Sequence, residues 1–160
     1  MKAADDMLYF IGRSPSAPQG ACITVCPWVY LCVINDMVEI VVLDDDICCI
    51  EAIKDISRRH FGHVDEEYEL RCHTDTEEFL NEMKERECDI ILLDMELPGT
   101  SGLEVGSKVK LCQPDAVLIF ITNYVEYAVA AYEVNAFRYI PKIMMEEKLP
   151  EAYTVLTNEM

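Results

Sequence analysis

From Met37 onward, short apolar runs alternate with stretches in which apolar residues recur at helical spacing. The runs lie at residues 38–43, 68–72, 90–93, 116–121 and 137–140. The stretch after the first run carries isoleucines three residues apart, at positions 47, 50, 53 and 56, which predicts a helix to about residue 60. Similar patterns predict helices after the other four runs, the fourth over about 125–132. Five strand–helix units favour a parallel sheet with helices on both faces.

The polarity of the runs predicts their order in this sheet. The first, third and fourth are apolar throughout, as expected of strands covered on both faces. The second alternates apolar with polar residues, and the fifth does so less regularly, which is typical of edge strands. We therefore predict an α/β fold, a doubly wound, flavodoxin-like (βα)5 three-layer sandwich with parallel strands in the order 2-1-3-4-5. Ligands of such sheets bind beyond the carboxyl ends of the strands, where the chain reverses direction between strands one and three.

Aspartates follow both strands at that reversal. Asp44 and Asp45 end the first run, and Asp94 ends the third. Neighbouring carboxylates raise one another's pKa and cost stability unless a cation neutralises them. Oxygen ligands with few protein donors favour Mg²⁺. For the acidic triplet 44–46 taken alone, an exposed acidic loop is an equal alternative, but Asp94 after a buried strand favours a metal site.

Two further polar residues belong to the same predicted edge. Thr122 follows the fourth strand and Lys142 follows the fifth. A carboxylate nucleophile, Asp94, can form an acyl phosphate, while a hydroxyl and an ammonium group can bind the phosphoryl oxygens. The residues together predict a phosphoryl-transfer centre.

Four segments carry a family resemblance: VVLDDD (41–46), IILLDMELPGTSGLE (90–104), FITN (120–123) and AFRYIPK (136–142). They resemble the signature blocks of CheY-like receiver domains of response regulators, and the resemblance covers residues 37–160. The stretch 121–142 is most similar to the LytTR-type (LytR/AgrA) subfamily, in which a DNA-binding domain follows the receiver. No such domain is present in this sequence. The chain is expected to be either a stand-alone receiver or, the interpretation that we favour, part of a longer transcription regulator.

The resemblance implies a role for each residue. Asp94 would be the phosphoacceptor, and Thr122 and Lys142 would bind the phosphoryl group. Mg²⁺ would be bound by Asp44, Asp45, Asp94 and the backbone carbonyl of Glu96. Thr122 and Tyr139 would form the conformational switch. The chain departs from the family pattern in two places: Ile143, where a proline usually follows the lysine, and Asn123, where a smaller residue usually follows the threonine.

The resemblance also implies partners. A sensor histidine kinase would donate the phosphoryl group, and the fourth helix, fifth strand and fifth helix would form a homodimer surface. This activity is that of a signalling phosphoacceptor with self-catalysed phosphorylation and dephosphorylation rather than of a metabolic enzyme. Two alternatives remain at this point. One is a pseudo-receiver that only docks partners. The other is a haloacid-dehalogenase-like phosphatase with Asp44 as the nucleophile and Asp46 two residues on.

The net charge and the cysteine content restrict the binding partners and the cellular location of the chain. The formal net charge is −17, which disfavours direct binding to nucleic acid or to an anionic membrane. The eight cysteines form no CxxC pair and lie mostly in apolar runs, which predicts free thiols and a cytoplasmic location.

The first thirty-six residues differ from the rest. They show no sustained period and carry loop residues before an apolar run, 21–34, that contains Pro27. Asp5 and Asp6 argue against a signal peptide, because they lie where that signal needs positive charge. We predict that residues 1–36 are an N-terminal extension outside the domain, and that residues 37–160 form the receiver domain.

Overall fold

The computed structural model describes residues 37–62, 67–124 and 134–158. The extension predicted for residues 1–36 and the helix predicted over 125–132 lie outside the described residues. Five parallel strands form one sheet: β1 (Met37–Leu43), β2 (Glu67–His73), β3 (Ile90–Leu93), β6 (Val117–Thr122) and β7 (Arg138–Pro141). Their order is β2-β1-β3-β6-β7, which confirms the predicted doubly wound topology.

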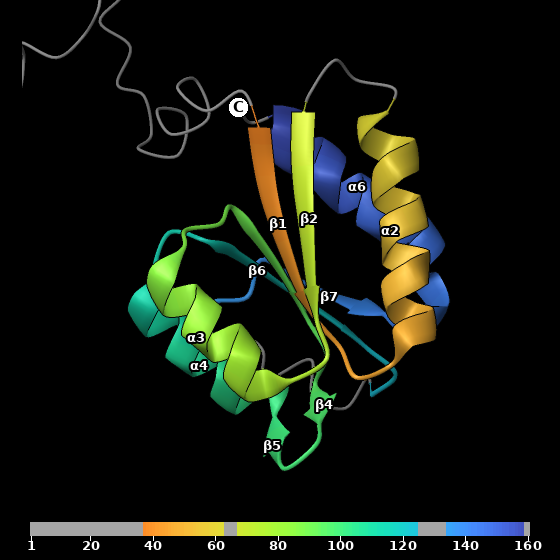
Figure 1. Ribbon diagram of the computed structural model, residues 1–160. Coiled ribbons are helices and arrows are strands. Elements are labelled where there is room, and N and C mark those ends of the chain that lie inside the picture. The colour runs from red at the N-terminus through yellow and green to blue at the C-terminus, as the bar shows by residue number, and fades with distance from the viewer. Residues whose placement is uncertain (1–36, 63–66, 125–133, 159–160) are drawn as a thin grey trace, which may run out of the picture.

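Helices cover both faces of the sheet (Figure 1). On one face lie α2 (Ile47–Phe61) and α6 (Met145–Asn158), and on the other lie α3 (Thr76–Glu85) and α4 (Gly102–Cys112). A short 3-10 helix, η4 (Lys142–Met144), joins β7 to α6. Among the described residues, no helix is long and apolar enough to cross a membrane.

Alternating side chains of the central strands supply two cores. Ile40, Val42 and Leu92 face α2 and α6, and Val41 and Leu93 belong to the core under α3 and α4. All five are at most 1% exposed. Burial of this apolar area is the main force that holds the layers together. The rigid sheet thereby fixes the ends of β1, β3, β6 and β7, where the candidate site residues begin.

Side-chain caps fix where three helices begin. Asp46 accepts a hydrogen bond from Cys48 N at the start of α2, Asp75 accepts one from Glu78 N at the start of α3, and Ser101 accepts one from Glu104 N at the start of α4. Each cap satisfies a helix amide that has no partner within the helix. The helices following β1, β2 and β3 therefore start close to the carboxyl edge of the sheet.

A two-stranded ribbon that the sequence patterns did not predict lies beside this edge. Strands β4 (Glu96–Leu97) and β5 (Thr100–Ser101) pair antiparallel around the turn Pro98-Gly99. Gly99 has a φ of 77°, a conformation that suits glycine at the third position of a type II turn, after proline. The ribbon brings the chain from Asp94 back to α4.

Candidate functional site

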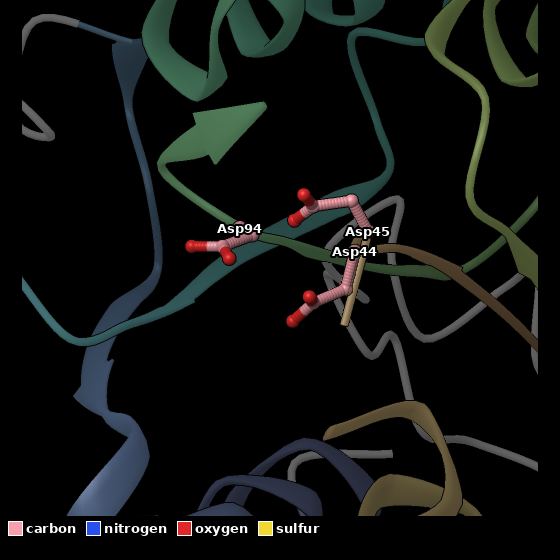
Figure 2. A group of neighbouring side chains, drawn as sticks. All are labelled: Asp44, Asp45 and Asp94. Atoms are coloured by element: carbon pink, nitrogen blue, oxygen red, sulfur yellow. The ribbon is translucent and has the colours of Figure 1, made fainter. Parts of the chain in front are cut away.

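Three carboxylates converge at the carboxyl ends of β1 and β3, as Figure 2 shows. Leu43 and Leu93 are paired in register, and the next residues along the two strands are Asp44 and Asp94. The Asp94 amide donates to the Leu43 carbonyl at 2.9 Å, which extends the strand pairing to the site. One carboxylate oxygen from each of Asp44, Asp45 and Asp94 lies within 4.8 Å of the other two. The structure therefore brings together the three aspartates that the sequence predicted.

Asp44 is the most buried of the three, with 1% of its surface exposed. Its Oδ1 accepts a hydrogen bond from the Asp46 amide at 2.8 Å. Its Oδ2 is buried and lies 2.7 Å from Lys142 Nζ in an ion pair. Asp45 is exposed and lines the pocket described below. The two adjacent aspartates thus occupy different environments.

Asp46 does not belong to the carboxylate cluster. Its Oδ1 accepts the Cys48 amide at 2.9 Å and caps α2. A carboxylate at this position also interacts favourably with the positive end of the helix dipole. The phosphatase alternative requires Asp44 and Asp46 to act together, and the use of Asp46 as a cap does not support that pairing.

Asp94 is 6% exposed, and both of its carboxylate oxygens have partners. Oδ1 accepts hydrogen bonds from the amides of Met95 at 2.6 Å and Glu96 at 3.4 Å. Oδ2 accepts one from Lys142 Nζ at 2.8 Å. These donors hold the side chain at the end of β3, where its carboxylate could act as a nucleophile.

Lys142 extends from the end of β7 and bridges Asp44 and Asp94. Burial disfavours the ammonium charge, but the hydrogen bonds and negative charge of the two aspartates outweigh it and raise the pKa of Lys142. The lysine is therefore protonated at neutral pH. Although Ile143 follows it in place of the usual proline, the ammonium group reaches the site.

Two other predicted site residues, Thr122 and Glu96, lie at the same edge, and Tyr139 lies within β7. Thr122 ends β6, is fully buried, and its Oγ1 accepts the Tyr124 amide at 3.3 Å. Glu96 is exposed, starts β4 and lines the pocket. Tyr139 lies on β7, opposite Phe120 in register, and packs on the core under α3 and α4. Its ring is 6.5 Å from the Phe120 ring and its hydroxyl oxygen is buried, so the ring points inward.

A pocket of about 690 Å³ opens over the cluster. Asp45, Asp94 and Lys142 line one side, and the β4–β5 ribbon lines another. Asn123, which occupies a position usually held by a smaller residue in the family, also lines it. The pocket gives a reactant access to Asp94 from solvent.

Gly102 allows α4 to start against the backbone of Asp94. Its amide donates to the Met95 carbonyl at 2.7 Å. A Cβ at this position would lie 2.2 Å from the Asp94 carbonyl oxygen and 2.8 Å from Met95 Cα, which is closer than any stable contact. Only glycine fits here.

Cys49 is a neighbour of the cluster that sequence reasoning did not single out. Burial, together with a hydrogen bond to Asp44 and the negative charge of that residue, raises the pKa of Cys49 to about 12. The thiol is 6% exposed and protonated. The only available signal was its position in the first turn of the helix that follows the aspartates.

The donor set fits Mg²⁺. The cluster offers three carboxylates, whose oxygens are hard ligands, at the end of a rigid sheet. Mg²⁺ is typically bound by one or two carboxylates and retains several waters. The open pocket leaves room for such waters and for a phosphoryl group.

Fold and site together define the class of this protein, and comparison with known families agrees. Residues 40–154 match the model of the response regulator receiver domain, so the chain belongs to that family. It is a receiver domain of a two-component response regulator related to LytT and LytR.

The curated relatives are longer regulators. The sensory transduction protein LytT of Bacillus subtilis (strain 168) is 24% identical over 115 residues, which cover 72% of this chain and 46% of that protein. LytT of Bacillus anthracis is 30% identical over 114 residues, or 71% of this chain and 44% of that protein. The chain thus spans about half the length of the curated relatives it matches.

Solved structures show the same fold. The response regulatory domain of protein mrkE from Klebsiella pneumoniae aligns with a TM-score of 0.67 at 22% identity, covering 75% of this chain and 95% of that chain. The response regulator TrrA from Thermotoga maritima, solved in complex with Mg²⁺ and BeF, aligns with a TM-score of 0.60 at 28% identity, covering 75% and 99%.

Proposed function

We propose that this domain accepts a phosphoryl group on Asp94 from a phosphohistidine of a sensor histidine kinase. The observation that carries the proposal is the cluster of Asp44, Asp45 and Asp94 at one edge of the sheet. The ammonium group of Lys142 pairs with two of its members, Asp44 and Asp94. An Asp94 carboxylate oxygen forms the new bond to phosphorus while the bond from phosphorus to the histidine nitrogen breaks. That nitrogen keeps the electron pair, and the product is an acyl phosphate.

The neighbouring residues assist this transfer. Asp44, Asp45, Asp94 and the backbone carbonyl of Glu96 would hold Mg²⁺, which supplies positive charge against the phosphoryl oxygens when bound. Lys142 and the hydroxyl of Thr122 bind the remaining phosphoryl oxygens. Glu96 is exposed and lines the pocket, where its side chain adjusts the access of water to the acyl phosphate.

Uptake of phosphoryl groups from acetyl phosphate in the presence of Mg²⁺, followed by intact mass, tests the proposal. We expect the wild-type chain to gain one phosphoryl group and Asp94→Asn to gain none. Asp89→Asn is the matched control, because Asp89 is an aspartate at the opposite end of β3. A wild-type chain that takes up no phosphoryl group would support the pseudo-receiver alternative. Borohydride trapping and peptide mapping would reveal a label on Asp44 if the phosphatase alternative held.

Phosphorylation then acts through a switch surface. The added group places about two negative charges beside Thr122 and Lys142. Movement of the threonine hydroxyl toward them, with Tyr139 held inward, biases β6, β7 and the helix predicted between them toward an active packing that exposes a homodimer surface. Sedimentation with and without beryllofluoride tests this step. A molecular mass in solution that does not change when beryllofluoride is added contradicts it.

The output is proposed to be transcription control through a LytTR-type DNA-binding domain in the full-length regulator. Curated relatives about twice as long as the matched region support it. We also propose a cytoplasmic location, supported by the free thiols of the described cysteines. DNA binding by a longer version of the chain, but not by this one, is the expected result.

A further inference from the structure

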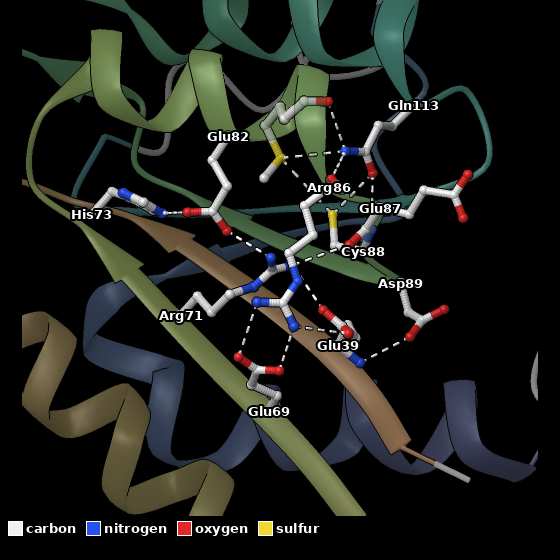
Figure 3. A network of polar contacts seen from close by, with 11 residues as sticks. Glu39, Glu69, Arg71, His73, Glu82, Arg86, Glu87, Cys88, Asp89 and Gln113 are labelled. Atoms are coloured by element: carbon white, nitrogen blue, oxygen red, sulfur yellow. Dashed lines mark hydrogen bonds and ion pairs between the residues drawn. The ribbon is translucent and has the colours of Figure 1, made fainter. Parts of the chain in front are cut away.

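His73 is a buried polar residue outside the phosphoacceptor site. It is the last residue of β2 and is only 9% exposed. Its Nε2 lies 2.7 Å from Oε2 of Glu82 on α3, as Figure 3 shows, and its ring meets the edge of the Phe79 ring with a centroid distance of 5.8 Å. The end of β2 is thereby held against α3 by one polar and one aromatic contact.

Glu82 is itself held in place from the other side. Its Oε1 lies 2.7 Å from Arg71 Nη1, and a second Arg71 nitrogen lies 2.9 Å from Glu39. Arg71 is 10% exposed, so water screens these ion pairs little. The orientation that Glu82 presents to His73 is therefore fixed by β1 and β2 (Figure 3).

The backbone of His73 connects this arrangement to the carboxylate cluster. The Asp44 amide donates a hydrogen bond to the His73 carbonyl at 3.2 Å, one residue beyond the register pair Leu43 and His73. Within the part of the chain that the structure describes, β1 is the only strand paired with the edge strand β2. If the end of β2 moves, no described strand on its other side holds the His73 carbonyl in place.

We infer that His73 and Glu82 are positioning residues for the cation ligand Asp44. The inference rests on the proposed function, because it assigns to Asp44 the role of a Mg²⁺ ligand. The Glu82 contact fixes the His73 side chain, the fixed residue holds its carbonyl toward β1, and that carbonyl orients the Asp44 backbone. Helix α3 thus contributes to the site without placing a side chain in it.

Mg²⁺ affinity of the full chain, measured by titration calorimetry, tests the inference. His73→Phe keeps a ring against Phe79 but removes the contact with Glu82, and Glu82→Ala removes the same contact from the other side. Each is expected to weaken Mg²⁺ binding about tenfold, at the lower end of what outer partners of metal ligands contribute. The double variant is expected to bind no more weakly than either single one, since all three lack the same contact. Glu82→Gln keeps an acceptor for His73 and is expected to restore most of the affinity.

A second measurement reports on Asp44 without any metal. Hydrogen exchange of the Asp44 amide, followed by NMR, detects the bond to the His73 carbonyl. We expect faster exchange of this amide in His73→Phe and in Glu82→Ala, and wild-type exchange in Glu82→Gln.

Arg86→Gln is the control that separates a general loss of stability from a specific loss of Mg²⁺ affinity. Arg86 pairs with Glu39 and Glu69 in the same network but has no contact with His73. It is expected to lower stability and to leave Mg²⁺ affinity unchanged. Wild-type affinity in His73→Phe, or equal weakening in Arg86→Gln, would overturn the inference while leaving the proposed function intact. A wild-type chain that binds no Mg²⁺ would overturn both.

Discussion

Lys142 and Asp94 lie 48 residues apart in the chain, and the lysine Nζ is 2.8 Å from Asp94 Oδ2. The same ammonium group is 2.7 Å from Asp44 Oδ2. It is thus the cation between two buried carboxylates, and its removal should be costly for the fold as well as for phosphoryl transfer.

We predict that Lys142→Met lowers the free energy of unfolding by about 3 kcal/mol, because it leaves two buried carboxylates without a counter-charge. Urea unfolding without divalent cations measures the loss, and added Mg²⁺ should recover part of it. The control is Lys148→Met, whose lysine pairs with exposed glutamates on α6. Equal stability of the two variants would contradict the prediction.

The ion network under α3 provides a second prediction. Arg71→Met leaves Glu39 and Glu82 largely buried without their common partner, and should cost about 3 to 5 kcal/mol of stability. Lys108→Met breaks an exposed pair with Glu104 and should cost no more than about 1 kcal/mol. Thermal or urea unfolding measures the loss of stability in both variants. Similar losses would show that the Arg71 ion pairs contribute no more than an exposed ion pair does.

Cysteine reactivity should follow burial. The pKa values of Cys49 and Cys88 are raised to about 12, chiefly by burial, whereas Cys48 and Cys112 are exposed. A pKa three units above the usual value lowers the thiolate fraction about a thousandfold at pH 8. Among the cysteines in the described residues, iodoacetamide should label Cys48 and Cys112 first, as peptide mapping would show. Early labelling of Cys49 would mean that the first turn of α2 opens readily.

Asp89 should make stability depend on pH. Burial raises its pKa, and a hydrogen bond from the Glu39 amide only partly opposes the shift. A carboxyl group whose pKa is higher in the folded state favours folding when protonated, and this contribution is lost as pH rises through that pKa. Asp89→Asn keeps an oxygen acceptor for the amide, so it should be more stable than wild type at pH 7. The advantage should shrink as pH falls toward 4, and unfolding at several pH values measures it.

Gly102 should tolerate no side chain. Gly102→Ala places a Cβ against the Asp94 carbonyl and forces either α4 or the Asp94 backbone to move. We expect lower stability and weaker Mg²⁺ binding in calorimetry. Gly99→Ala adds a Cβ with open space around it and costs only the strain of its positive φ, about 1 kcal/mol. A Gly102→Ala variant with wild-type Mg²⁺ affinity would show that the helix start can shift without disturbing the site.

The sequence was sufficient to predict the sheet order and the residues at its edge, because runs buried on both faces differ visibly from edge strands. It did not predict the β4–β5 ribbon, since strands of two residues are too short to show a period. It also failed to predict the role of Glu69, Arg71 and His73. Their alternation with apolar residues indicated only an edge strand. Arg71 and His73 have Glu82 of α3 as their partner, and Glu69 pairs with Arg86.

The three consecutive aspartates at positions 44, 45 and 46 have different physical roles. One carboxylate is buried against an ammonium group, the next is open to solvent, and the third caps a helix amide. In a deep mutational scan, asparagine should therefore be tolerated at 46, where it still accepts the cap hydrogen bond, and rejected at 44. The same exchange of aspartate for asparagine would therefore have a different effect on fitness at each of the positions 44, 45 and 46.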